Sequence, residues 1–383
     1  MKPIAERIAT TAVFLANGLG IGAWAVEVPR IKEELGLSNT ALGIALFAFA
    51  LGAIVSMPLA GRMVPRFGSG RATAFLAVIF VLALPLPAIV PNFALLCAVL
   101  FALGAANGAV DVSMNGHASM IEAKWQRPIM SSFHAAWSFG GLLGAAFGAA
   151  IQLNGFGVIG GFLLPDLVIG ILVLTSALLA LRDSGPRLRK STSGLMIPSA
   201  GVMQLAALAF LCMLVEGAVA DWSAVFLSSV LIKQASAAAL GYSSFAFAMA
   251  VCRVVGDQGV RRMGSETVVA IGGLFATIGL ALVLGFPNVV TAVAGFALVG
   301  IGLANVVPVI FSVAGQLTTP SVTGVSMVAT AGYVGFLIGP PLIGLGAGFV
   351  GLRIALCALL LATLIVCLLG GNAVSKMTVK LAR

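Results

Sequence analysis

Charged residues are scarce in this sequence, at 9% of 383 residues against about 25% in a soluble globular domain. Hydrophobic residues make up 60% of the chain, and the mean hydropathy is +1.14. A chain of this composition cannot cover its surface with polar atoms in water. We therefore exclude a soluble enzyme, a disordered chain and a nucleic-acid-binding protein, and we expect an environment of lipid.

Several patterns that support catalysis are also missing. The sequence contains no GxxxxGK[ST] loop for ATP and no HExxH zinc motif. It contains only two histidines, and none of its five cysteines are spaced as CxxC. Cysteines within apolar runs act as small packing residues. We therefore expect no metal, no cofactor and no enzymatic activity.

The hydrophobic residues gather in runs long enough to cross a bilayer, which requires about 20 residues of helix. They predict twelve spans, at 8–28, 40–60, 72–90, 93–113, 129–151, 158–181, 202–226, 240–258, 267–286, 289–312, 324–348 and 351–370. The longest connector is polar and basic. We therefore predict an all-α membrane protein with an N-terminal six-helix bundle (1–181), a cytoplasmic linker (182–201) and a C-terminal six-helix bundle (202–383).

The basic residues explain the net charge of +9 and predict an orientation. Of the 21 lysines and arginines, sixteen fall at the two termini and in one set of alternate connectors, and four fall in the opposite set. Cytoplasmic loops carry the excess of positive charge in membrane proteins. Both termini are therefore expected in the cytoplasm, which requires an even number of spans.

The two halves resemble each other. Residues 41–50 match residues 239–248 at seven of ten positions, and the same offset of 198 pairs Trp24 with Trp222. An offset of 196 pairs Pro91-Asn92 with Pro287-Asn288. The first run, with Lys2, Arg7 and an A-x-A sequence at 23–25, also fits a cleaved signal peptide. The repeat favours a retained first helix, because that helix has a counterpart in the second half.

The chain resembles the major facilitator superfamily over its whole length, and within it the bacterial inner-membrane proteins of the YbjJ-like group. The segments that carry this resemblance are Asn17-Gly18 with Trp24, Pro29-Arg30-Ile31-Lys32, Asp111 to Asn115, Ser131 to Ser138, Glu216-Gly217-Ala218 with Asp221-Trp222-Ser223, and Arg253 with Gly256-Asp257. The resemblance implies two pseudo-symmetric six-helix bundles that move a small solute by alternating access, usually as a monomer.

The superfamily's signature between the second and third helices is Gly-x-x-x-Asp-Arg-x-Gly-Arg-Arg/Lys. Arg66 matches it, but Pro65 stands in place of the acidic residue. Asp257 follows Arg253 by four residues and offers a similar pair in the second half. We therefore assign Arg66, Arg253 and Asp257 to gating, with a static ion pair of Arg253 and Asp257 as the alternative.

Polar side chains inside spans are expected to face protein or a water-filled cavity. Asn107, Asp111 and Asn115 lie four residues apart on one helix face. Asp111 and His134 are expected at similar depths, where a His–carboxylate pair can hold a proton. Structural hydrogen bonds between helices are the alternative. For Asn115, near the cytoplasmic end, a solvated side chain is a further alternative, and we assign His117, expected in a loop, no role.

The first helix carries Asn17, Trp24 and Glu27 broadly on one face. We predict that Asn17, Trp24 and Trp137 contact substrate, although Trp24 also fits an interfacial aromatic belt. Glu27 is expected at the water boundary.

Glu216 is the expected centre of proton coupling in the second half, because a carboxyl group out of water can exchange protons near neutral pH. Asp221 is a second candidate, with a gate or a structural hydrogen bond as its alternative. Asp166 is assigned a structural role. The remaining candidate substrate contacts in this half are Trp222, Asn305, an echo of Asn107, and Tyr333.

These residues predict a secondary transporter of the bacterial inner membrane, coupled to protons. Carboxylates, amides and aromatic rings suit a sugar-like solute or a cationic or aromatic amphiphile. A membrane sensor or scaffold that kept the fold and lost transport is the alternative.

Overall fold

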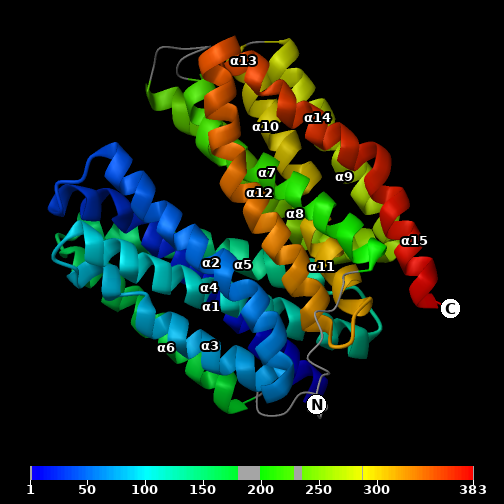
Figure 1. The fold of residues 1–383 in the computed structure, drawn as a ribbon, viewed down its shortest axis with the longest axis horizontal. Helices are drawn as coiled ribbons and strands as arrows, with labels where there is room; N and C mark the ends of the chain where they lie inside the picture. The colour runs from blue at the N-terminus through cyan, green and yellow to red at the C-terminus, as the bar shows by residue number, and fades with distance from the viewer. Residues whose placement is uncertain (1, 180–198, 228–234, 287, 383) are drawn as a thin grey trace. The chain divides into compact units, whose positions relative to one another are not determined.

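The computed structural model describes residues 2–179, 199–227, 235–286 and 288–382, and their regular structure is helical (Figure 1). The first half contains α1 (Lys2–Glu34), α2 (Asn39–Phe67), α3 (Ser69–Ala83), η1 (Leu86–Ile89), α4 (Phe93–Trp125), α5 (Met130–Leu153) and α6 (Val158–Leu179). Residues 182–198 of the predicted linker lie outside the described residues.

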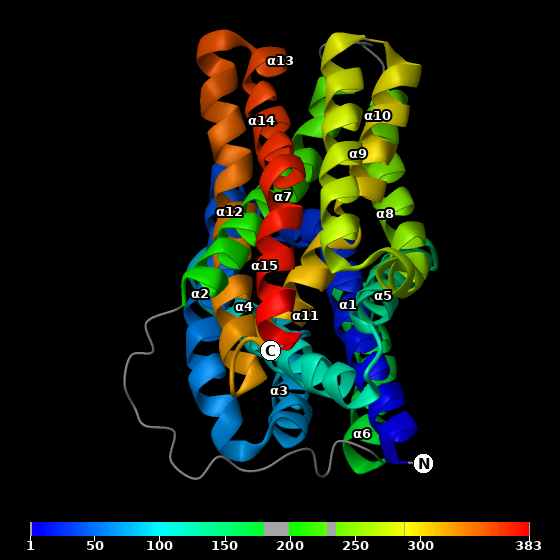
Figure 2. The same ribbon diagram turned by 90° about the vertical axis from the view of Figure 1, so that its right-hand side faces the viewer.

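The second half begins with α7 (Ala200–Phe226), α8 (Ala235–Met263), α9 (Ser265–Gly285), α10 (Val289–Leu303) and α11 (Val306–Gln316). It continues with α12 (Ser321–Val350), α13 (Leu352–Ala355), α14 (Cys357–Ile365), η3 (Val366–Gly370) and α15 (Gly371–Ala382). Figure 2 shows α13, α14 and α15 stacked end to end as one column beside α9.

Eleven helical segments of the described chain are long and apolar enough to cross a membrane. The remaining predicted span, 240–258, falls on α8, which has 29 residues but contains Arg253 and Asp257. The prediction of an all-helical protein with twelve long helices is confirmed. Several helices extend beyond the predicted runs, as α4 does by twelve residues, because hydropathy marks only the part of a helix that lipid surrounds.

Contacts between Cα atoms divide the chain into two compact units. The N-terminal unit comprises the described residues among 1–126, 133–195 and 318–326. The C-terminal unit comprises those among 127–132, 196–317 and 327–383. Within the N-terminal unit α2 packs mainly on α4, and within the C-terminal unit α9 and α8 pack mainly on α10.

Glycines allow helix backbones in the N-terminal unit to touch. A Cβ atom added to Gly104 of α4 would overlap the carbonyl oxygen of Phe49 on α2. The same holds for Gly18 of α1 against the carbonyl of Trp137 on α5. In lipid there is no hydrophobic effect to drive helices together. Small residues at such crossings instead stabilise the contact through close van der Waals packing.

The corresponding helices of the C-terminal unit pack in the same way. Gly300 of α10 lies against the carbonyl of Phe245 on α8, and Gly335 of α12 against that of Phe210 on α7. The helix caps repeat as well, because Asn92 accepts from the backbone of Leu95 at 3.0 Å and Asn288 accepts from that of Thr291 at 3.0 Å. The offset is 196 residues for the caps and for the contacts of Gly104 and Gly300.

The turns between the second and third long helices of each unit also match at this offset. Gly68 joins α2 to α3 with φ 86°, and Gly264 joins α8 to α9 with φ 84°. Only glycine adopts this backbone conformation without strain. The two junctions therefore share one geometry, although their neighbouring side chains differ in charge.

Replacing Gly104 with Ala tests the backbone contact between α4 and α2. We expect Gly104→Ala to lower stability by about 1–3 kcal/mol, because the added methyl group overlaps Phe49. The control is Gly43→Ala on α2, since a Cβ atom there meets nothing within 4 Å. Melting temperatures of both purified variants in detergent provide the measurement, and equal stability of the two would contradict the proposed packing.

Candidate functional site

Three of the predicted substrate-binding residues meet in the N-terminal unit. Asn17 on α1 donates from Nδ2 to Oδ1 of Asn107 on α4 at 2.9 Å. The indole Nε1 of Trp137 on α5 donates to Oδ1 of Asn17, also at 2.9 Å. Both asparagines are buried, and Trp137 is half-buried. The cluster joins three helices through neutral groups that can donate and accept hydrogen bonds.

A second polar cluster lies along the same face of α4. Asn115 donates from Nδ2 to Oδ1 of Asp111 at 3.2 Å and to the backbone oxygen of Asp111 at 2.9 Å. Its Oδ1 is 3.0 Å from Nε2 of His134 on α5, so the histidine nitrogen donates. The amide of Asn115 therefore connects the carboxyl group of Asp111 to the imidazole of His134.

This arrangement excludes the solvated alternative for Asn115 and corrects the expectation for His117. Asn115 is fully buried rather than solvated, and His117 lies inside the helix rather than in a loop. Nδ1 of His117 is 2.9 Å from Oγ of Ser69, the first residue of α3. Both differences arise because α4 continues to Trp125, well past the end of its apolar run.

Two further residues of α1 differ from expectation. Glu27 is fully buried rather than at the water boundary: it forms an ion pair with Arg30 at 3.2 Å and accepts from Nε2 of Gln152 at 3.2 Å. Trp24 is 7% exposed and packs between the rings of Phe49 and Phe162. Its surroundings are those of an aromatic core rather than of an interfacial belt, and a role in substrate contact remains a prediction.

The C-terminal unit places its predicted coupling residue beside an arginine. Glu216 on α7 is half-buried and interacts electrostatically with Arg253 on α8. Tyr242, one of two tyrosines in the chain, interacts electrostatically with Glu216, Arg253 and Asp221. The sequence reasoning missed Tyr242, which lies eleven residues before Arg253 on the same helix.

Arg253 is held in place by a break in the helix opposite. The guanidinium Nε donates to the carbonyl oxygen of Ala304 at 3.1 Å. In a regular helix that oxygen accepts the backbone N–H four residues later, but residue 308 is proline and has none. The chain therefore divides into α10 and α11 at Ala304 and Asn305, and the arginine supplies the missing donor.

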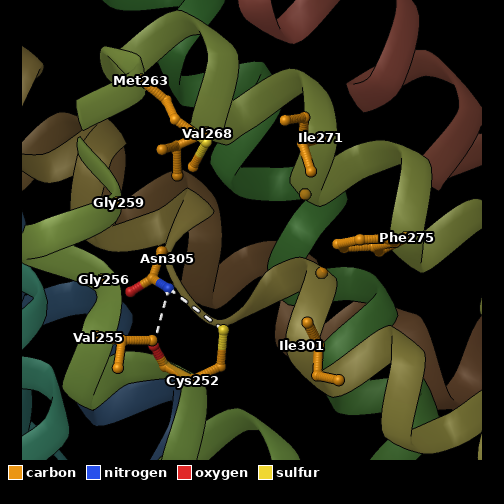
Figure 3. Close-up of a pocket in the computed structure, with 12 residues that line it drawn as sticks. Cys252, Val255, Gly256, Gly259, Met263, Val268, Ile271, Phe275, Ile301 and Asn305 are labelled. Atoms are coloured by element: carbon orange, nitrogen blue, oxygen red, sulfur yellow. Dashed lines mark hydrogen bonds between the residues drawn. The ribbon is translucent and has the colours of Figure 1, made fainter. Parts of the chain in front are cut away.

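Asn305 lies at this break and points into a small pocket between α8, α9 and α10 (Figure 3). Its Nδ2 donates to the backbone oxygen of Cys252 at 3.2 Å and lies 3.7 Å from Sγ of the same residue. Its Oδ1 is buried and has no hydrogen-bond partner among the described residues. The pocket has a volume of about 150 Å³, room for a small molecule only.

The remaining candidates of this unit lie on α7 and α12. Trp222 donates from Nε1 to the carbonyl oxygen of Pro340 at 3.0 Å. Asp221 is exposed, and it lines a cavity of about 540 Å³ together with Trp222 and Pro340. Tyr333 is half-buried on α12. Although Trp222 pairs with Trp24 in the repeat, the two indoles have different neighbours.

The residues assigned to gating are placed as follows. Asp257 accepts from the backbone N–H of Ser132 at 3.2 Å through Oδ1. The predicted pairing of Arg253 with Asp257 remains a prediction. Arg66 is exposed at the end of α2. In the described part of the chain, no three histidine, cysteine or acidic side chains are grouped so that they could hold a metal ion.

Comparison with known sequences places this geometry in context. A sequence model of the Major Facilitator Superfamily matches residues 10–324. The transporter y4wD of Sinorhizobium fredii is 36% identical over 344 residues, 90% of this chain and 91% of that protein. An MFS-type transporter of Yersinia pestis is 34% identical over 94% of each chain. Membrane protein MosC of Rhizobium meliloti is 36% identical over 94% of this chain and 89% of its own.

Solved structures share the fold at low sequence identity. The fucose:proton symporter FucP of E. coli aligns with a TM-score of 0.79 and 16% identity, over 98% of this chain and 99% of that chain. A bacterial homologue of the iron transporter ferroportin aligns with a TM-score of 0.71 and 15% identity, over 98% and 99%. The helical architecture is therefore that of these transporters.

Replacing Asn115 tests the polar connection along α4. Asn115→Leu keeps the side-chain volume but leaves His134 and Asp111 without their shared partner in a buried place. We expect a loss of about 1–3 kcal/mol, because the hydrogen bonds of Asn115 to both groups are removed in a buried place. The control is Asn154→Leu, because Asn154 is exposed and its side chain donates to the nearby carbonyl oxygen of Ala150. Thermal unfolding in detergent measures both, and an unchanged melting temperature for Asn115→Leu would contradict the bridge.

Proposed function

The chain belongs to the major facilitator superfamily and is a membrane transporter, and on that premise we propose that it moves a small solute across the bacterial inner membrane by alternating access, coupled to protons. The observation that carries the proposal is the placement of polar clusters within the apolar helices of both units. Ionisable groups inside a membrane are costly, and they are retained where solutes or protons pass.

Coupling to protons is proposed to centre on Glu216. Its carboxyl group is half-buried within a span and lies in the electrostatic reach of Arg253 and Tyr242. A proton on Glu216 removes the attraction to Arg253, so protonation changes the free energy of that contact. The chain of Asp111, Asn115 and His134 is the second candidate, because histidine exchanges protons near neutral pH. Asp221, which is more exposed, is a third.

The substrate is proposed to be a neutral polar solute such as a sugar, with a cationic or aromatic amphiphile as the alternative. The amides of Asn17 and Asn107 and the indole of Trp137 suit hydroxyl groups. Trp24, Trp222, Asn305 and Tyr333 complete the proposed set. An organic anion is disfavoured because Arg253 already interacts with Glu216. Among the proteins of this fold, FucP is named as a fucose:proton symporter.

The remaining features of the proposal follow from the sequence. Both termini are proposed to lie in the cytoplasm because of the distribution of lysine and arginine. The protein is proposed to be a member of the YbjJ-like group and to act as a monomer. Arg253, Asp257 and Arg66 are proposed to take part in gating. A sensor or scaffold without transport is the competing function, and it predicts no solute flux under any gradient.

Identifying the solute requires a binding screen that also shows whether binding depends on pH. We expect purified protein to gain thermal stability with one class among sugars, amines, nucleosides and amphiphilic drugs, because a ligand that binds only the folded state stabilises it. The gain is expected to differ between about pH 6 and about pH 8, where histidine and buried carboxyl groups titrate. A ligand whose stabilisation is the same at both values would argue against coupling.

Replacing Glu216 with Gln tests the coupling site. With a pH gradient of about one unit, one coupled proton supports about tenfold accumulation of solute in proteoliposomes. We expect Glu216→Gln to lose this accumulation and to keep the exchange of solute down its own gradient. The control is Glu34→Gln, since Glu34 is exposed at the end of α1. Accumulation by Glu216→Gln at the wild-type level would remove Glu216 from the mechanism.

A further inference from the structure

A groove lies between α2 and α3 within the N-terminal unit, and Ala109 of α4 also lines it. Its volume is about 750 Å³, within the range of about 300–1,000 Å³ that holds organic ligands in proteins. Residues of α2, α3 and α4 line it, among them Leu59, Met63, Phe67, Phe75, Leu76 and Ala109. The groove is outside the polar clusters that the transport proposal uses.

The walls of the groove are apolar and open to the surroundings. Met63, Phe67 and Phe75 are 52%, 59% and 66% exposed, although each lies in a helix long and apolar enough to span the membrane. Exposed apolar side chains at membrane depth contact lipid, so the surroundings of these walls are acyl chains. The apolar lining of the groove therefore suits a hydrocarbon chain.

One end of the groove is strongly basic. Arg66 and Arg71 line it and are both exposed, on either side of the turn at Gly68. The chain has no acidic residue between Glu34 and Asp111, so α2 and α3 carry positive charge alone. Guanidinium groups bind phosphate oxygens through paired hydrogen bonds, and this geometry favours arginine at phosphate sites.

The internal repeat supplies a matched groove for comparison. Shifting the twelve lining residues of the first groove by 196 gives nine that line the pocket in Figure 3: Cys252, Val255, Gly256, Gly259, Met263, Val268, Ile271, Gly272 and Asn305. The other three, Val260, Arg262 and Thr267, do not line it. The lining residues drawn there are apolar apart from Cys252 and Asn305. The shift carries Arg66 to Arg262, Arg71 to Thr267 and Gly70 to Glu266, so the second turn carries charge of both signs.

We propose that the groove between α2 and α3 binds one anionic phospholipid, with its phosphate on Arg66 and Arg71 and an acyl chain along Met63, Phe67 and Phe75. Charge complementarity selects the occupant, because the basic end lies where an apolar groove in a membrane-spanning unit meets the polar head groups. The predicted orientation places this end at the cytoplasmic leaflet, whose anionic lipids attract each nearby arginine. The matching pocket of the C-terminal unit differs, because no arginine lines it and Glu266 accompanies Arg261 and Arg262 at the matched turn.

Lipid retention by the full chain tests the site. Protein purified in detergent is titrated with phosphatidylglycerol or with phosphatidylcholine of the same acyl chains, and bound lipid is counted by native mass spectrometry. We expect Arg66→Gln with Arg71→Gln to lower the affinity for phosphatidylglycerol by about tenfold or more and to leave that for phosphatidylcholine unchanged. Both arginines are exposed, so the variant is expected to keep the wild-type melting temperature.

Arg261→Gln with Arg262→Gln is the control, because it removes the same charge at the matched turn and is expected to retain phosphatidylglycerol. Three results would overturn the proposal: wild-type affinity in the double variant of Arg66 and Arg71, an equal loss in the control, or equal retention of phosphatidylcholine and phosphatidylglycerol by the wild type. Displacement of the lipid by inorganic phosphate at the same concentration would also overturn it, since the acyl chain would then contribute nothing. None of these readouts depends on transport.

Discussion

Lipid tails offer no hydrogen bonds, and this constraint governs where the polar side chains of the protein lie. Both units contain polar groups that contact one another across helices. In the N-terminal unit amides and an indole join α1, α4 and α5, and a second amide connects Asp111 to His134. In the C-terminal unit Arg253 and Glu216 interact across α7 and α8. The groups suited to handling a solute or a proton thus also hold the helices together.

Backbone breaks serve the same requirement. Pro308 leaves the carbonyl of Ala304 without its helical donor, and the guanidinium of Arg253 takes that position. The next residue, Asn305, then turns its amide toward Cys252 and keeps an oxygen without a partner among the described residues. A transporter that binds and releases ligands needs polar groups that are available at some stage, and a broken helix is one way to provide them inside an apolar bundle.

The sequence predicted the helices and the repeat well, because hydropathy and spacing act locally. It could not predict side-chain partners, which depend on how neighbouring helices are rotated. Asn115 lies between Asp111 and His134 for that reason, and Glu27 finds Gln152 on α5 rather than water. Trp24 and Trp222 occupy matching positions of the repeat, yet one packs on phenylalanines and the other bonds Pro340. Two residues at matching positions of the repeat can therefore have different neighbours and different hydrogen bonds.

The central claim is that solute and protons cross together. It is tested most directly with proteoliposomes that enclose a pH-sensitive dye, to which the solute found by screening is added without any initial pH gradient. The account predicts that solute addition changes the internal pH, and that the change disappears with Glu216→Gln. Solute entry into wild-type vesicles at constant internal pH, with the buffer capacity kept low, would contradict it.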